Sequence, residues 1–359
     1  MGDSAITGQR IDSMDGLRFL MCVGIADLHL AGYFWSTPGA ETYADRFRYF
    51  TDVFFIISGF FLARSNRASR LAIDDYPRFI LLRWARIYPL YALTLGFYVT
   101  IAAAAAAGAI TPSNPERYDL SQLWSHLLLM QSWGGQESLI FNYPAWSLSA
   151  LWLFALLFPA AFPLMRRPWL LAGLTLAALF ATAATGRAAC GLPVTDLQQC
   201  GLGVLHGLSP FLFGIWLAAL GIFRLPRLVV VAGLLVCTWL LFGAPWVFEG
   251  VPRRFAVAAF VFFFLAADYA GVRTPLGAPL LRRQGKYAFG LYLLHAIVAT
   301  VFLRAFADAY LDLERLGDAA KLGLLTTALA LSYGLAVAVY WGFEMPVFRY
   351  FRDRRWRAA

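Results

Sequence analysis

The chain has 359 residues, of which 60% are hydrophobic and only 14% are charged, and its formal net charge is +9. Soluble globular proteins carry roughly 25% charged and roughly 45–50% apolar residues, so this composition excludes an ordinary water-soluble core and indicates a protein whose solvent is the lipid bilayer. The positive charge does not by itself point to nucleic acid as a partner.

Long apolar runs with little alternation of polar and apolar residues predict an all-α, polytopic membrane helix bundle. The predicted spans are 17–36, 49–64, 87–110, 145–164, 168–185, 203–222, 228–244, 254–271, 286–306 and 320–343. The stretch 121–133 is too short to cross, and we expect an amphipathic helix at the membrane surface. If it did cross, one more span would result and the topology after it would be inverted.

The distribution of basic residues supports ten spans. With a cytoplasmic N-terminus, 21 of the 30 Lys and Arg residues fall on the cytoplasmic side. This bias is typical of cytoplasmic loops, so we expect both termini in the cytoplasm. Arg253 and Arg254 fall on the outer side and contradict the bias. No cleavable signal is visible, and we expect one membrane domain over residues 1–359 without a soluble extension.

The four cysteines divide into two pairs by position. Cys190 and Cys200 lie in the polar link 186–202 on the predicted outer side, where a disulfide and two free thiols are both open possibilities. Cys22 and Cys237 lie in spans and are expected to be packing residues. No CxxC or HxxxH spacing occurs, so the sequence predicts no metal site.

The first span contains polar residues that are costly in lipid. In "GLRFLMCVGIADLHL", residues 16–30, Arg18 and His29 are eleven positions apart. They therefore share a helix face about 16 Å apart along the axis, with Arg18 at the inner interface and His29 near mid-membrane. A hydrogen bond across helices would also explain His29. Asp27 is a possible charge partner, but residues i and i+2 do not face each other, so another span would have to connect them.

A second cluster of polar residues lies at the start of the third span. Arg83 and Arg86 in "FILLRWARIYPLY", residues 79–91, share one face at the inner boundary. Two guanidinium groups there suit a cytoplasmic phosphate or pyrophosphate. Ordinary anchoring and contact with lipid headgroups explain most arginines in this position equally well.

Together with these clusters, further motifs resemble the membrane-bound acyltransferase-3 family. The first span resembles the family's opening, and "YFTDVFFIISGFFLA" at 49–63 resembles its second span. "RWARIYPLY" matches its RxxR motif, "GKYAFGLYLLHAIV" at 285–298 its late span, and "FEMP" at 343–346 its final Glu-x-Pro. The motifs occur in family order across residues 11–348, so the resemblance covers nearly the whole chain.

The resemblance implies transfer of an acyl group from cytoplasmic acyl-coenzyme A to a hydroxyl group of a sugar or related acceptor. His29 is then the expected general base, because burial favours the neutral imidazole that can take up a proton. Arg18 would hold the donor or orient the site, and Asp27 is expected to be a further catalytic residue. The inner-face arginines Arg83 and Arg86 would bind the phosphates of coenzyme A.

Further candidate residues follow from the same resemblance. Asp52, Trp146, His295 and Glu344 are expected to contact substrate, although a helix cap, a membrane anchor, packing and an ion pair with Arg349 are the respective alternatives. His126 and His206 match no pattern and are expected to be structural.

One departure from the family pattern concerns its usual glutamate. In "AWSLSALWLFALLFP", residues 145–159, Leu151 stands where the family has Glu. Leucine cannot accept a proton. Asp27 would replace that carboxylate, or the acceptor chemistry is altered, or activity is weak or lost.

Two classes of function therefore stay open. The first is an integral-membrane O-acyltransferase of the bacterial inner membrane that transfers an acyl group, acetyl by default, to an envelope or exported glycan or glycoside. The second is a non-catalytic transporter or flippase-like carrier, or a degenerate acyltransferase. No obvious inverted repeat supports the carrier.

Overall fold

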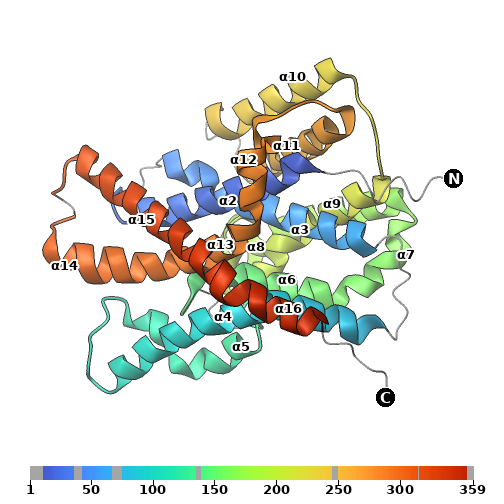
Figure 1. The fold of residues 1–359 in the computed structure, drawn as a ribbon. Coiled ribbons are helices and arrows are strands. Elements are labelled where there is room, and N and C mark those ends of the chain that lie inside the picture. Colours follow the sequence, from blue (N-terminus) through green and yellow to red (C-terminus); the bar gives the residue numbers. More distant parts are fainter. Residues whose placement is uncertain are drawn as a thin grey trace.

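The computed structural model describes residues 11–35, 43–66, 75–134, 139–244, 250–313 and 315–353, and helices are the only regular secondary structure within these ranges (Figure 1). The helical segments of the first half are α2 (Asp12–Ala31), η1 (Tyr43–Tyr49), α3 (Phe50–Asn66), α4 (Tyr76–Ala106), η3 (Pro115–Tyr118), η4 (Leu120–Gln122), α5 (Leu123–Leu127), η5 (Tyr143–Ala145), α6 (Trp146–Leu157), η6 (Phe158–Ala161), α7 (Phe162–Met165) and α8 (Pro168–Cys190).

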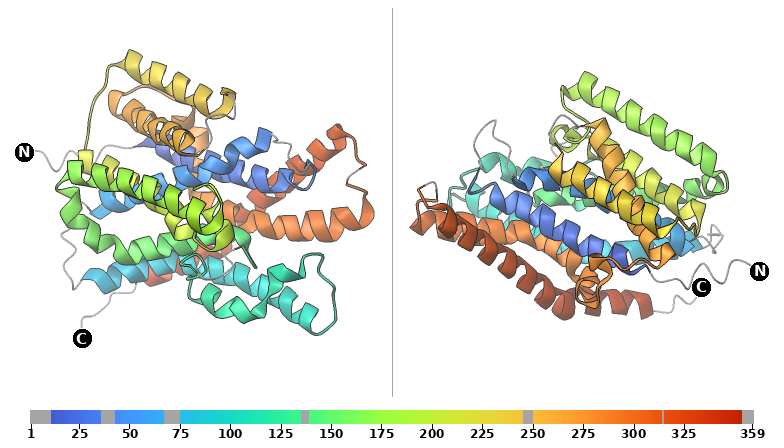
Figure 2. Two further views of the ribbon diagram at one scale, coloured as in Figure 1. Left: turned by 180° about the vertical axis from the view of Figure 1, so that it is seen from behind. Right: turned by 90° about the horizontal axis from the view of Figure 1, so that it is seen from above.

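The helical segments of the second half are η7 (Leu197–Cys200), α9 (Gly203–Leu220), α10 (Arg227–Thr238), η8 (Trp239–Gly243), α11 (Val251–Ala270), η10 (Pro275–Gly277), α12 (Pro279–Arg282), η11 (Arg283–Tyr287), α13 (Ala288–Val298), η12 (Ala299–Ala307), α14 (Asp308–Tyr310), α15 (Asp318–Val339), η13 (Tyr340–Glu344) and α16 (Met345–Asp353). Seen from above, the long helices run side by side in a common direction (Figure 2). This arrangement is that of a helix bundle.

Every predicted span overlaps a helical run, which confirms the all-α, multi-pass class. Six runs in the described part of the chain are long and apolar enough to cross a membrane: Tyr76–Ala106, Tyr143–Met165, Pro168–Cys190, Gly203–Leu220, Pro279–Tyr310 and Asp318–Asp353. A shorter apolar run covers Arg227–Gly243. The count of ten crossings and the cytoplasmic position of both termini stay predictions.

The helices α2, α3 and α11 differ from these six runs for physical reasons. α3 has only 17 residues. α2 carries several charged side chains within its 20 residues, and α11 carries Arg253, Arg254 and Asp268. Charged residues within a membrane helix are expensive unless they face the protein interior. Arg253 and Arg254 do so, since their exposed fractions are 1% and 5%.

Two helices have bounds that differ from the stretches predicted for them. α4 begins at Tyr76 instead of residue 87, because Pro77 occupies its first turn and the arginines that follow are good helix formers rather than loop residues. The stretch 121–133 contains only the short segments η4 and α5. Trp124, Leu127 and Leu128 are exposed there while His126 is buried. This surface is amphipathic as expected, although its helix is much shorter.

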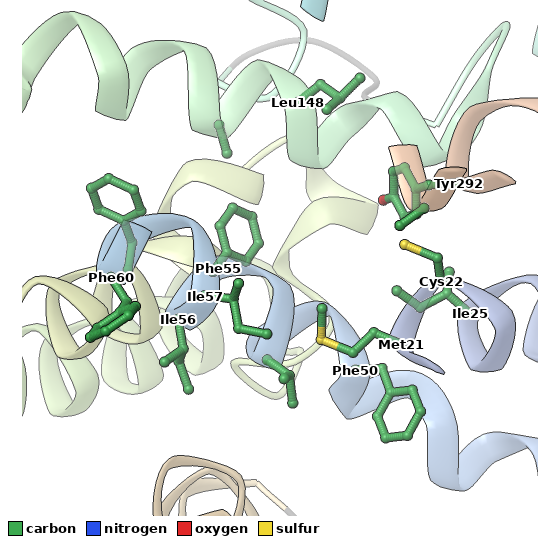
Figure 3. Close-up of a cluster of buried hydrophobic side chains, with 14 of the residues drawn as sticks. Met21, Cys22, Ile25, Phe50, Phe55, Ile56, Ile57, Phe60, Leu148 and Tyr292 are labelled. Carbon is green, nitrogen blue, oxygen red and sulfur yellow. The ribbon is translucent and has the colours of Figure 1, made fainter. Parts of the chain in front are cut away.

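α2 lies at the centre of the bundle, where it contacts α3, α11, α13 and α15. Its residues Met21, Cys22 and Ile25 belong to the main buried apolar cluster, together with Phe50 and Phe55 from α3 (Figure 3). Cys22 is a buried free thiol, as is Cys237. The position of α2 places its polar residues among several other helices.

α3 and α9 approach each other closely at two glycines. A Cβ atom on Gly214 would lie 2.0 Å from the carbonyl oxygen of Ile56, and one on Gly59 would lie 2.2 Å from that of Phe211. Small residues at such crossings let two backbones touch, which is common between membrane helices. The two helices are therefore locked together at this crossing.

The link between α8 and α9 is closed by a disulfide. Cys190 and Cys200 are bonded, with a Cα–Cα distance of 6.4 Å. This resolves the alternative between a disulfide and two free thiols that the sequence left open.

Candidate active site

Two histidines that are 266 residues apart meet inside the bundle. Nδ1 of His29, near the end of α2, lies 2.9 Å from Nε2 of His295 in α13. The rings are nearly parallel, with centroids 5.1 Å apart. His295 is fully buried, whereas His29 is partly exposed. Two of the predicted site residues are thus in direct contact, and His29 is the more accessible of them.

A chain of hydrogen bonds determines where the protons of this pair lie. Nδ1 of His295 is 3.2 Å from the carbonyl oxygen of Leu291. Because a carbonyl oxygen only accepts, His295 carries its proton on Nδ1 and accepts at Nε2. His29 therefore donates from Nδ1, and neutral His29 keeps a lone pair on Nε2. This nitrogen is able to take up a proton.

Aromatic and cationic side chains surround the histidine pair. The ring of Tyr143 packs edge-on against His29, with centroids 4.8 Å apart. The guanidinium carbon of Arg117 lies 4.6 Å from the centroid of Tyr143. Arg117 donates to the carbonyl oxygen of Phe141 at 3.0 Å and to the hydroxyl of Tyr98 at 3.3 Å. Arg117 is therefore fixed one aromatic ring away from His29.

A cavity of about 540 Å³ begins at Arg117. It lies between the end of α4, the η3 segment and η12, and Tyr33 also lines it. Tyr33 follows His29 by four residues, just beyond the end of α2. The histidine pair thus lies close to a cavity large enough for a small molecule.

A group of charged residues lies nearer the start of α2. Arg18 forms an ion pair with Asp15 at 3.6 Å, and its guanidinium lies 4.8 Å from the ring of Phe61. The guanidinium of Arg86 is close enough to repel that of Arg18. Arg86 in turn lies 3.9 Å from the buried carboxylate of Glu344. The structure therefore gathers Arg18, Arg86 and Glu344 from three helical runs.

The ion-pair partner of Glu344 is Arg86 and not its sequence neighbour Arg349. Arg83 packs on Phe79, with its guanidinium carbon 5.7 Å from the ring centroid. Arg83 and Arg86 both lie in α4, three residues apart.

Asp27 contacts Tyr43 and not His29, which was its possible charge partner. Its Oδ1 atom accepts a hydrogen bond from the hydroxyl of Tyr43 at 3.4 Å. Burial, reinforced by the charge of Asp27, raises the pKa of Tyr43 to about 12, so this hydroxyl stays protonated and can donate. The side chains of Asp27 and His29 diverge because two successive helical steps turn by about 200°.

Asp52 and Trp146, both expected to contact substrate, belong to a second buried cluster. Oδ1 of Asp52 lies 3.1 Å from Nη2 of Arg254 and 3.0 Å from Nε2 of His206. Nδ1 of His206 lies 3.0 Å from Oε1 of Gln198. The ring of Trp146 packs edge-on against His206, 5.0 Å between centroids. An apolar cavity of about 280 Å³ between α8, α9 and α11 reaches this cluster.

This cluster explains the charges that contradicted the topology rule. Arg254 compensates Asp52 inside the protein, and it also donates to the carbonyl oxygen of Val194 at 3.3 Å. Arg253 donates to the carbonyl oxygens of Leu240 and Leu241. These arginines are internal partners and not loop residues, so the rule for loop charges does not apply to them.

Leu151 lies in α6 and packs, partly buried, against the main apolar cluster. The residue one turn earlier, Ser147, lies 2.8 Å from the hydroxyl of Tyr292. Leu151 thus occupies an apolar environment that a carboxylate would not favour.

The predicted site residues did not include Arg117, Tyr143 or Arg254, and His206 was expected to be structural. A titratable residue within the apolar run 203–222 was a usable signal for His206, by the same logic that singled out His29. Arg117 lies in a polar link and carried no such signal. Among the described residues, no group of three His, Cys, Asp or Glu side chains could hold a metal ion.

Comparison with known proteins gives a consistent result. The family pattern described as an acyltransferase domain, of the acyltransferase-3 type, matches residues 11–341. The chain is 30% identical to a protein named acyltransferase MdmB from Streptomyces mycarofaciens, over 96% of this chain and 94% of that protein. No solved structure matches the chain. The chain therefore belongs to the acyltransferase-3 family, and it is a membrane acyltransferase.

Proposed function

We propose that this protein is an O-acyltransferase that moves an acyl group, acetyl by default, from cytoplasmic acyl-coenzyme A to a hydroxyl group of an envelope or exported glycan. The observation that supports it most is the contact between His29 and His295. Their hydrogen bonds leave Nε2 of the accessible histidine as a proton acceptor. An acyl transfer to a hydroxyl needs such a group.

In the proposed reaction, Nε2 of His29 takes the proton of the acceptor hydroxyl group. The oxygen of that hydroxyl group attacks the thioester carbonyl carbon at the same time. The carbon–sulfur bond breaks, and the thiolate of coenzyme A receives the proton from His29. The products are an ester and free coenzyme A, so His29 ends in its starting form. His295 keeps His29 in the required tautomer and orientation, as a partner residue does in other base-assisted sites.

The donor would approach from the end of α2 that carries Arg18. Arg83 and Arg86 on α4 offer two further guanidinium groups, which bind phosphate oxygens well. Arg18 and His29 lie eleven residues apart on α2, about 16 Å along the axis. A phosphate-bearing donor with an extended arm would therefore reach the histidine pair from the arginine group.

The proposed location is the bacterial inner membrane, with ten crossings and both termini in the cytoplasm. The same orientation places Arg83 and Arg86 on the side where acyl-coenzyme A is made. It places the 540 Å³ cavity on the opposite side.

The first test is the release of free thiol from acetyl-, propionyl- and succinyl-coenzyme A by membranes that contain the protein. His29→Ala should abolish release, and Arg83→Ala should raise the concentration of donor needed for half-maximal rate. Arg315→Ala is the matched control, because the Arg315 side chain is 89% exposed. No release from any donor, even with an envelope extract as acceptor, would contradict the proposal and favour a carrier or a degenerate enzyme.

A further inference from the structure

We propose that the 540 Å³ cavity beside Arg117 binds a neutral glycosyl ring of the acceptor. This inference rests on the proposed function, since it names where and how the acceptor of that reaction is held. The volume lies within the roughly 300–1,000 Å³ typical of small-molecule sites.

The lining of the cavity has the chemistry that a sugar requires. Aromatic side chains are contributed by Tyr33, Phe97 and Tyr118. Flat aromatic faces cover the C–H surface of a sugar ring, and the two tyrosines add hydroxyl groups. Asn114 and Thr300 add a side-chain amide and a hydroxyl, which both donate and accept. Such alternation matches a ring that is apolar on its faces and hydroxylated at its edge.

The two arginines of the cavity, Arg117 and Arg304, are already engaged by groups of the protein. Nη1 of Arg304 lies 3.3 Å from Oδ2 of Asp308, and its Nε donates to the hydroxyl of Ser113 at 2.8 Å. The positive charge of Arg304 is therefore balanced within the cavity. Arg117 directs its charge at the rings of Tyr98 and Tyr143, with centroid distances of 5.1 and 4.6 Å. The lining therefore carries a net positive charge, but Nε and one terminal nitrogen of each arginine already donate within the protein, so no free guanidinium fork is presented to an anion.

The helices that carry the histidine pair also reach the cavity. Tyr33 follows His29 by four residues, and Thr300 follows His295 by five. The Thr300 hydroxyl lies 3.2 Å from that of Tyr98, which accepts from Arg117. Because Arg117 and Tyr143 lie between the cavity and His29, the ring held here would be a neighbour of the one that carries the reacting hydroxyl group.

A cysteine-labelling experiment tests the site without knowledge of the natural acceptor. Val301 lines the cavity and is 49% exposed, so Val301→Cys should react with a membrane-impermeant maleimide. The native background is low, since Cys22 and Cys237 are buried and Cys190 and Cys200 are bonded to each other. Leu311→Cys is the control, because Leu311 is 41% exposed and lies near the cavity but does not line it.

The probes are methyl β-D-glucopyranoside and methyl α-L-rhamnopyranoside, with methyl β-D-glucuronoside as the anionic counterpart and glycine betaine as the osmotic control. A neutral glycoside at about ten times its Kd should slow labelling of Val301→Cys about tenfold and leave Leu311→Cys unchanged. The proposal would be overturned if neither neutral glycoside slowed the labelling, or if the glucuronoside alone slowed it.

The labelling result is independent of acyl transfer. Protection without any thiol release from acyl-coenzyme A would support the sugar site and contradict the proposed enzymatic activity. Thiol release that needs His29, without protection, would support the activity and contradict the sugar site.

Discussion

His295 is the residue through which the protein controls the proton on His29. Its own Nδ1 proton is held by the carbonyl oxygen of Leu291, one helical turn earlier. A backbone carbonyl in a helix has a fixed position, so the orientation of His295 is set by α13 itself. The hydrogen bond between His295 and His29 therefore fixes the orientation of the His29 ring on α2.

Substitutions at His295 should therefore separate acceptor chemistry from simple packing. His295→Gln keeps an acceptor for the Nδ1–H group of His29, and we expect it to retain most of the thiol-release rate. His295→Leu removes the acceptor and should lower kcat by about tenfold or more, since the base loses its tautomer. The measurement is kcat at saturating acyl-coenzyme A, and the two variants must be compared at equal folded protein. Equal activity of the two variants would contradict the role of the hydrogen bond.

The pair Arg86–Glu344 permits a second prediction at the same scale. Arg86→Ala leaves the buried carboxylate without its cation, and we expect a loss of about 1–2 kcal/mol in stability. Adding Glu344→Gln should restore most of this stability but should not restore the affinity for acyl-coenzyme A. The measurements are the midpoint of thermal unfolding in detergent and KM for the donor. A double variant as unstable as Arg86→Ala would show that the pair does not account for the loss.

At the scale of helices, the contact between α3 and α9 depends on two glycines. An added methyl group on Gly214 would overlap the carbonyl oxygen of Ile56, which is backbone and cannot rotate away. The two helices would have to separate. Their separation would also disturb Asp52 and His206, which lie on these same helices.

Gly214→Ala should accordingly destabilise the protein by about 1–3 kcal/mol, as overpacking does elsewhere. Gly323→Ala is the matched control, because a Cβ atom there would have no neighbour within 4 Å. The readout is the thermal unfolding midpoint of both variants in the same detergent. If Gly214→Ala unfolds at the temperature of the control, the close approach of α3 and α9 is not important for stability.

The disulfide between α8 and η7 acts on the second buried cluster. It closes a short loop that contains Gln198, which contacts His206, and Val194, whose carbonyl oxygen accepts from Arg254. By loop-closure entropy, a loop of this length contributes about 3 kcal/mol. The loop therefore helps to hold the partners of Asp52 in place.

We expect reduction of Cys190–Cys200, or the double change Cys190→Ser and Cys200→Ser, to lower the unfolding midpoint measurably. Reductant should have no further effect on the double variant, since its two remaining cysteines are not bonded. An unchanged midpoint after complete reduction, verified by mass spectrometry, would contradict this stabilising role.

At the scale of the whole molecule, the distribution of basic residues predicts ten crossings with both termini in the cytoplasm. Fusions of alkaline phosphatase and of a fluorescent protein after Pro112, Arg224 and Leu313 test this prediction. We expect phosphatase activity after Pro112 and Leu313, and fluorescence after Arg224. If the segment 121–133 crossed the membrane, the results after Arg224 and Leu313 would be exchanged.

The sequence predicted the helices well because each one needs a long apolar run, which is a local property. The predicted third span began at residue 87 because arginines are costly in lipid and were expected at the inner boundary, whereas the helix itself extends back to Tyr76. His29 was recognisable as a polar residue in an apolar run. Its contact with His295 depends on how α2 and α13 pack. The two residues are 266 positions apart, so no local sequence pattern indicates the contact. The partnership of Asp52 with Arg254 was missed for the same reason.

The separation of Asp52 and Arg254 along the chain has a consequence for synthesis. The ribosome completes the carboxylate 202 residues before its guanidinium partner. At about 5–20 residues per second, α3 exists for about 10–40 s before α11 emerges. During that time the newly made α3 carries an acidic group without its guanidinium partner. Assembly of this protein is therefore a delayed event, in which an early helix reaches its final environment only after most of the polypeptide has been translated.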